Sequence, residues 1–154
     1  MPTETLIPMR SFTIESVVAG TVGALAMMPA GFLFRALQMR VGHYGPKFAE
    51  LYLSAPGPAA LFAQHMVLGW LSAVPLVLLP LHRMPGLAVS LAGAVYGALY
   101  YAAVNALALP LYFGDQLPWR LGWSVVVPSL VVHVVFGMAV AHSVQFLRRK
   151  SAPA

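Results

Sequence analysis

Residues 86–113 read GLAVSLAGAVYGALYYAAVNALALPLYF and contain no charged side chain. An α-helix rises about 1.5 Å per residue, so about 20 apolar residues cross the roughly 30 Å hydrocarbon layer of a bilayer. Three further runs of the same character lie at about 14–34, 58–81 and 121–147. The sequence therefore predicts an all-α fold, a polytopic membrane protein built as a bundle of four transmembrane helices.

The composition of the whole chain supports this class. Of the 154 residues, 60% are hydrophobic and 8% are charged, whereas about a quarter of the residues of a soluble domain carry charge. No linker or low-complexity tract divides the chain, so residues 1–154 are expected to form one membrane domain. The absence of cysteine excludes disulfides and thiolate metal sites. The lipid bilayer is the expected partner.

The basic residues predict the orientation. They lie at the ends of the apolar runs and form no basic stripe with interleaved aromatics, which argues against a nucleic-acid partner. With four spans, the two termini and the turn at 82–85 share one side of the membrane. That side carries Arg10, Arg83, Arg148, Arg149 and Lys150, and the other carries Arg35, Arg40, Lys47 and Arg120, with Glu50 and Asp115. By the positive-inside rule both termini are cytoplasmic. An amphipathic segment in 41–57 is expected at the opposite interface.

Rows of small residues predict the helix contacts, because membrane helices associate through close packing. Such rows contain Gly69 in the second run, Gly93 and Gly97 in the third and Gly137 in the fourth. The polar residues His65, Asn105 and His133 fall on the same rows, and an intramembrane polar group should face a partner inside the bundle. The sequence therefore predicts one polar cluster of His65, Asn105 and His133 in the half of the bundle away from the termini.

Two titratable residues lie near the cytoplasmic ends of their spans. Glu15 begins the first run, and His142 lies about five residues from the end of the last run. A contact between them would compensate two groups that are costly to bury. We therefore expect a Glu15–His142 pair.

Several chemical readings of the histidines remain open. They can act as neutral groups that join helices, as a proton relay or pH sensor, or as ligands of a b-type haem or metal, with His65 and His133 as the ligands. His133 and His142 are nine residues apart, on opposite faces, and cannot bind one metal. Met27, Met28, His65 and Met66 have the side chains that copper prefers, although methionine is also a common packing residue. We expect no resident cofactor.

One family resemblance rests on the second half of the chain. The segments QHMVLG (64–69), LPW (117–119) and HVVFGMAVAHSVQFLRR (133–149) resemble the YagU-like bacterial inner-membrane proteins over residues 60–149. The resemblance implies a multi-pass protein of the bacterial inner membrane in a family without an assigned activity. This chain has Asn105 where that pattern has a third histidine, and its polar loop after the first helix is shorter.

These observations favour a small integral membrane protein without catalysis, in a structural, accessory or stress-related role. Motifs for phosphate binding, zinc hydrolysis and serine hydrolysis are missing from the sequence. Assembly as a homo-oligomer or within a larger membrane complex is expected. The alternatives are a module that conducts protons or small solutes, or senses pH, through its histidines, and the haem or metal protein described above.

Overall fold

The computed structural model describes residues 9–42 and 44–151, and this part of the chain is helical without a strand. Three long elements are single helices, and the fourth is a composite of three segments. The long elements are α1 (Met9–Ala36), α3 (Pro58–Val77), α4 (Gly86–Tyr100) continued by η2 (Tyr101–Ala108) and α5 (Leu109–Phe113), and α7 (Trp123–Ser151). The short ones are α2 (Tyr44–Ala49), η1 (Leu81–Arg83) and α6 (Pro118–Leu121).

Four helices are long and apolar enough to cross a membrane, with mean hydropathies between 1.5 and 2.2. The predicted fold class is thereby confirmed. The second helix is shorter than its expected run, because α3 ends at Val77 and the chain turns through Pro80 into η1. The last helix is longer and continues to Ser151, since its basic end is helical too.

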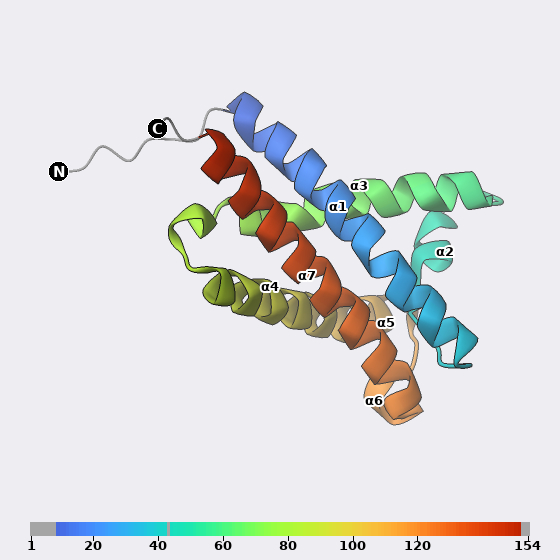
Figure 1. Ribbon diagram of the computed structural model, residues 1–154. Helices are drawn as coiled ribbons and strands as arrows, with labels where there is room; N and C mark the ends of the chain where they lie inside the picture. Colours follow the sequence, from blue (N-terminus) through green and yellow to red (C-terminus); the bar gives the residue numbers. More distant parts are fainter. Residues whose placement is uncertain (1–8, 43, 152–154) are drawn as a thin grey trace.

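The four long helices pack side by side in the order α3, α1, α7 and α4. α1 packs against α7, α3 packs against α1, and α4 packs against α7. The axes of α3 and α4 diverge away from the chain termini (Figure 1). We call the end that holds the start of α1, η1 and the end of α7 the terminal end. The opposite end, with α2, α5 and α6, is the loop end.

Glycines set the closest helix contacts. A Cβ atom on Gly97 would lie 2.1 Å from the carbonyl oxygen of His133, and one on Gly93 would lie 2.6 Å from that of Gly137. A Cβ atom on Gly69 would lie 3.0 Å from the Gly20 oxygen, at the crossing of α1 and α3. The predicted glycine rows thus form helix contacts within one chain, at Gly69, Gly93, Gly97 and Gly137.

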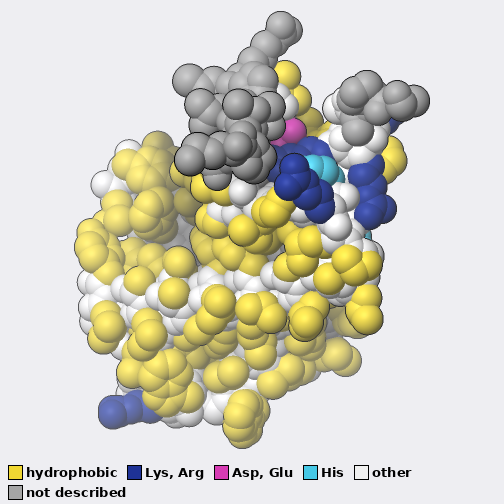
Figure 2. Space-filling model, turned by 90° about the vertical axis from the view of Figure 1, so that its left-hand side faces the viewer, with side chains coloured by type: hydrophobic (Ala, Val, Ile, Leu, Met, Phe, Trp, Pro, Cys, Tyr) yellow, Lys and Arg dark blue, Asp and Glu magenta, His cyan; other side chains and the backbone are white. Residues whose placement is uncertain are grey.

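The outward surface of the bundle is apolar. Leu87 is 85% exposed, and Leu71 and Leu99 are each 63% exposed. Hydrophobic side chains cover most of the face in Figure 2, and basic side chains gather near the terminal end beside an acidic and a histidine side chain. Lipid can solvate such a surface at no cost, whereas water cannot.

The terminal half has a dry core. Leu76, Val77, Leu81, Val89 and Val140 belong to one cluster and are 0–1% exposed. They come from α3, η1, α4 and α7. Because aliphatic side chains from all these elements meet here, the bundle is filled at this level.

Candidate functional site

The loop half is hollow where the terminal half is filled. A partly open cavity of about 520 Å³ lies between α3 and η2, with α1 and α7 behind it and the α2 segment at its loop end. The three polar residues of the predicted cluster, His65, Asn105 and His133, all line it. We call it the histidine cavity. Its volume lies within the range of 300–1,000 Å³ that is typical of small-molecule sites.

His133 is fixed by hydrogen bonds from both ring nitrogens. Nδ1 lies 2.6 Å from the carbonyl oxygen of Ser129, and Nε2 lies 3.0 Å from Nδ2 of Asn105. The carbonyl can only accept, so Nδ1 carries the proton, and Nε2 of the neutral ring accepts from the Asn105 amide. Tyr100 and Tyr101 flank the ring, each with a centroid distance of 5.8 Å. His133 therefore sits as a neutral, oriented imidazole in the wall of the cavity.

His65 occupies the α3 side of the same cavity. Its Nε2 lies 3.1 Å from the carbonyl oxygen of Ala24 in α1, next to the Gly20–Gly69 crossing. The carbonyl accepts, so Nε2 donates. The two histidines share one cavity without a direct hydrogen bond between them among the contacts described.

A local change of helix type presents Asn105. Residues 101–108 form the wide π-helical segment η2, in which Leu109 N–H bonds to Val104 O. Pro110 follows directly and lacks the N–H that an α-helix would use to bond Ala106. Wide turns of this kind are frequent at functional sites. Pro110 is the sequence signal for this departure.

Polar side chains join α3 to α4 at the deep end of the cavity. Ser72 Oγ donates to the Tyr100 hydroxyl oxygen at 2.9 Å, and the Tyr96 hydroxyl donates to the Ser72 carbonyl. Ser72 and Tyr100 line the cavity. Among the described residues, the lining contains no Asp, Glu, Lys or Arg. The cavity is therefore apolar with a few uncharged hydrogen-bonding groups.

The α2 segment covers the loop end of the cavity. Gly42 N–H donates to Ser129 Oγ at 3.0 Å, and Gln64 Nε2 donates to the Gly45 carbonyl at 2.9 Å. Phe48 lines the cavity, whereas Leu51 and Tyr52 are exposed. The amphipathic segment expected at the interface thus also forms a wall of the site.

An ion pair ties this cover to the next loop. Lys47 Nζ lies 2.6 Å from Asp115 Oδ2, and the Tyr44 ring stacks on Phe113 at a centroid distance of 5.9 Å. Burial raises the pKa of Tyr44 to about 12, with a further contribution from the charge of Asp115 and the hydrogen bond to it. The Tyr44 hydroxyl is therefore neutral over the physiological range.

His133 does not suit a haem or metal in this arrangement. A metal needs a ring nitrogen with a free lone pair, and both nitrogens of His133 are engaged. Met27 lines the cavity with His65, but residues 9–42 and 44–151 contain no cluster of three His, Asp or Glu side chains that could hold a metal ion.

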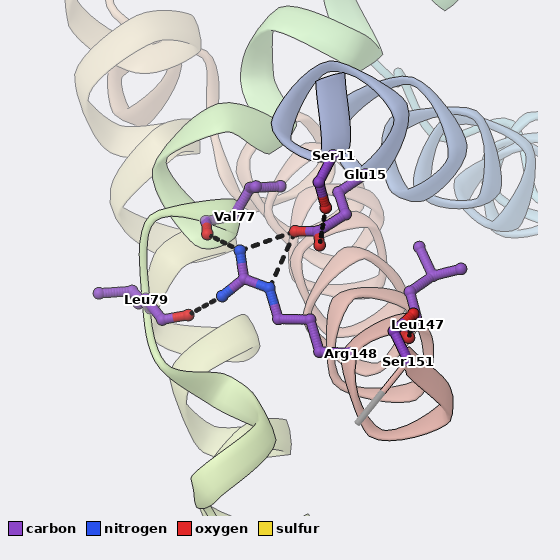
Figure 3. A network of polar contacts seen from close by, with 7 residues as sticks. All are labelled: Ser11, Glu15, Val77, Leu79, Leu147, Arg148 and Ser151. Carbon is purple, nitrogen blue, oxygen red and sulfur yellow. Dashed lines mark hydrogen bonds and ion pairs between the residues drawn. The ribbon is translucent and has the colours of Figure 1, made fainter. Parts of the chain in front are cut away.

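The expected Glu15–His142 contact is not the one that forms. Glu15 Oε2 instead lies 2.7 Å from Nη2 and 2.9 Å from Nε of Arg148 (Figure 3). Arg148 also donates to the carbonyls of Val77 and Leu79, which end α3. A fully charged guanidinium satisfies a buried carboxylate and these open carbonyls together, which one imidazole could not do.

His142 has a different partner. Its Nε2 lies 2.8 Å from Ser90 Oγ of α4, and its side chain is exposed. Neither Arg148 nor Ser90 was predicted as a partner of these residues. The signal for Arg148 was present, since its charge is opposite to that of Glu15 and both residues belong to the same end of the bundle.

Comparisons with known proteins identify no relative. No protein-family model, curated protein or solved structure matches the chain significantly.

Proposed function

We propose that this chain is a non-catalytic integral membrane protein that binds an uncharged amphiphilic molecule from the bilayer in the histidine cavity. The observation that carries this proposal is the lining of the cavity. It combines a large apolar area with the neutral polar groups of His65, Asn105 and Tyr100, and it contains no charged residue among those described.

The lining supports an uncharged class of ligand. A charged headgroup in this cavity would lose its hydration without a counter-charge, which is costly. The second amide hydrogen of Asn105 and the Tyr100 hydroxyl can donate, and the free nitrogen of His65 can accept. A neutral head with carbonyl or hydroxyl groups and an apolar tail fits these groups.

Binding of matched probes tests the proposal. The probes are a short-chain isoprenoid quinone, dioctanoylglycerol and dodecanoate, measured against detergent-purified protein by native mass spectrometry. We expect at least one of the two neutral probes to bind, and dodecanoate to bind at least tenfold more weakly. Equal binding of dodecanoate would refute the ligand class, and binding of no probe would refute the function.

Two tryptophan substitutions on α3 locate the binding. Leu68 lines the cavity, whereas Leu71 is 63% exposed on the outer surface. Leu68→Trp should fill the cavity and weaken binding at least tenfold. Leu71→Trp adds the same side chain towards lipid and should leave binding unchanged. Equal effects of the two substitutions would show that the probes bind elsewhere.

The proposed location is the bacterial inner membrane, with both termini in the cytoplasm. Support comes from Arg148, Arg149 and Lys150 at the end of α7 and from the resemblance to YagU-like proteins. The sequence has no cysteine, so Ser54→Cys and Ser151→Cys are clean reporters. An impermeant maleimide should label the first in intact spheroplasts and the second only after permeabilisation, and the reverse pattern would overturn the orientation.

A second candidate function is the sensing of pH or the conduction of protons. It is favoured by one observation, the presence of His65 and His133 in the same cavity. An external acid pulse on proteoliposomes with an internal pH dye tests conduction, because His133→Ala should abolish a flux that uses this residue.

A further inference from the structure

A second, smaller cavity lies on the other side of Asn105. Its volume is about 20 Å³, and Tyr101, Asn105, Ser129, Gly42 and Gln116 contribute to its lining. We call it the Tyr101 cavity. About 10–15 Å³ suffices for one water molecule, provided that two to four polar groups surround it. The size and the lining meet both conditions.

The Tyr101 hydroxyl indicates which kind of molecule occupies this cavity. Tyr101 is 6% exposed, and its hydroxyl has no hydrogen-bond partner among residues 9–42 and 44–151. Leaving a buried hydroxyl unsatisfied is costly. In contrast, the hydroxyls of Tyr96 and Tyr100, on the same helix, have partners within the chain.

Gln116 places one edge of this cavity at the loop end. Its side chain is exposed and contributes to the lining. Asn105 lines both cavities and bonds to Nε2 of His133. A water molecule here would complete a hydrogen-bonded path from the loop end through Asn105 to His133.

The path has no counterpart on the other side of His133. Towards the terminal end, Leu76, Val77, Leu81, Phe136 and Val140 fill the bundle and are 0–4% exposed. The hydrophobic side chains of this cluster can neither hold a water chain nor pass a proton. Among the described residues, the buried polar side chains of the terminal half are Glu15, which pairs with Arg148, Gln145, which donates to the carbonyls of Leu81 and Met84, and Ser16, whose Oγ has no hydrogen-bond partner.

We infer that a water molecule binds in the Tyr101 cavity and is hydrogen-bonded to the Tyr101 hydroxyl. This water links the loop end to the Asn105–His133 pair. The path of hydrogen bonds stops at the dry terminal half. Among residues 9–42 and 44–151, the titratable groups that line the two cavities are His65 from α3, Tyr44 from α2, Tyr100 and Tyr101 from α4 and η2, and His133 itself. Among the described residues, α1 contributes no titratable group to either lining.

This inference bears on the second candidate function. It gives the Asn105–His133 pair contact with water from one side of the membrane only, which favours a sensor over a conductor. It needs no ligand in the histidine cavity, so its test and the amphiphile test can fail separately.

Asn105 is the single asparagine in the sequence, which makes it a specific probe. Protein labelled with [¹⁵N]asparagine in lipid bilayers gives one side-chain amide signal. Water-edited solid-state NMR then measures the transfer of magnetisation from water to this amide. We expect rapid transfer in the unmodified protein. No transfer would overturn the water site.

Two valines on α7 provide a matched pair of variants. Val125 lines the Tyr101 cavity, whereas Val127 does not line it and is 36% exposed. Val125→Leu adds a methylene group to the cavity wall and should lower the transfer at least twofold, and Val127→Leu should not change it. Unchanged transfer in Val125→Leu would mean that water reaches Asn105 from the histidine cavity, which overturns the inference.

Two further measurements complete the test. If Val125→Leu does not fold, Tyr101→Phe removes the unpartnered hydroxyl and should lower the transfer in the same way. Proteoliposomes with an internal pH dye should acidify no faster than protein-free vesicles after an external acid pulse. Faster acidification would overturn the dry end of the path.

Discussion

The polar groups inside the two halves of the bundle have opposite surroundings. In the terminal half, Glu15 and Arg148 pair at 2.7 Å next to a filled aliphatic cluster. In the loop half, His65 and His133 face a cavity of about 520 Å³ together with Asn105. The difference indicates that the terminal half holds the helices together, and it supports the proposal that the loop half binds a guest molecule.

The contact at the border of the two halves should be the most sensitive to substitution. A side chain on Gly97 would overlap the His133 backbone, which is only 2.1 Å from its Cβ position. We expect Gly97→Val to cost about 3 kcal/mol or more through overpacking, measured as loss of the folded, monodisperse protein. Gly31→Ala is the control, because no atom lies within 4 Å of that Cβ position. Equal effects would contradict the assigned helix crossing.

The next largest effect belongs to the terminal half. Arg148→Met leaves Glu15 buried without its counter-charge, and we expect a loss of about 3–5 kcal/mol in the free energy of unfolding. The double variant Glu15→Gln/Arg148→Met should lose less than Arg148→Met alone, since no charge is then left unpaired. Denaturation curves of the two single variants and the double variant give the coupling. A double variant as unstable as the sum of the singles would argue against the pair.

In the loop half, the corresponding substitution should cost less stability. His133→Phe keeps a ring in place but removes the bonds to Ser129 and Asn105, so we expect a loss of about 1–3 kcal/mol. His142→Phe, at an exposed site, should change the melting temperature little. A loss from His133→Phe as large as that from Arg148→Met would remove the contrast between the halves.

The smallest effect concerns the cover of the cavity. The folded chain raises the pKa of Tyr44 to about 12, whereas an unfolded tyrosine titrates near 10. The stability contributed by this hydroxyl is therefore fully present below about pH 10 and is lost as the pH rises towards 12. Melting temperatures from pH 9 to 12 should fall more steeply for the unmodified protein than for Tyr44→Phe. Tyr112→Phe, at an exposed residue, should follow the unmodified protein.

The fold was predictable because hydropathy and length alone define four spans. The three polar residues of the histidine cavity were predictable in part, because the four-residue spacing from glycines places them on packed faces. The cavity itself was not predictable. It depends on the divergence of α3 from α4, which follows from crossing angles and not from any local pattern.

Two other features were not predicted from the sequence, for different physical reasons. Arg148 was interpreted as a topological signal, although a long side chain can extend back along its helix to a buried carboxylate. The wide turn at Asn105 results from Pro110, which lies further along the helix. A prediction that assumes regular α-helical spacing by four residues does not include such a turn.

The ion pair of Glu15 and Arg148 also has a consequence for biosynthesis. The two residues are 133 positions apart, so at about 5–20 residues per second the ribosome makes the second roughly 7–27 s after the first. During that interval the Glu15 carboxylate lacks the partner that it has in the folded chain, and burying it unpaired would be costly. We therefore expect the first helix to reach its final packing only after the last helix has been made.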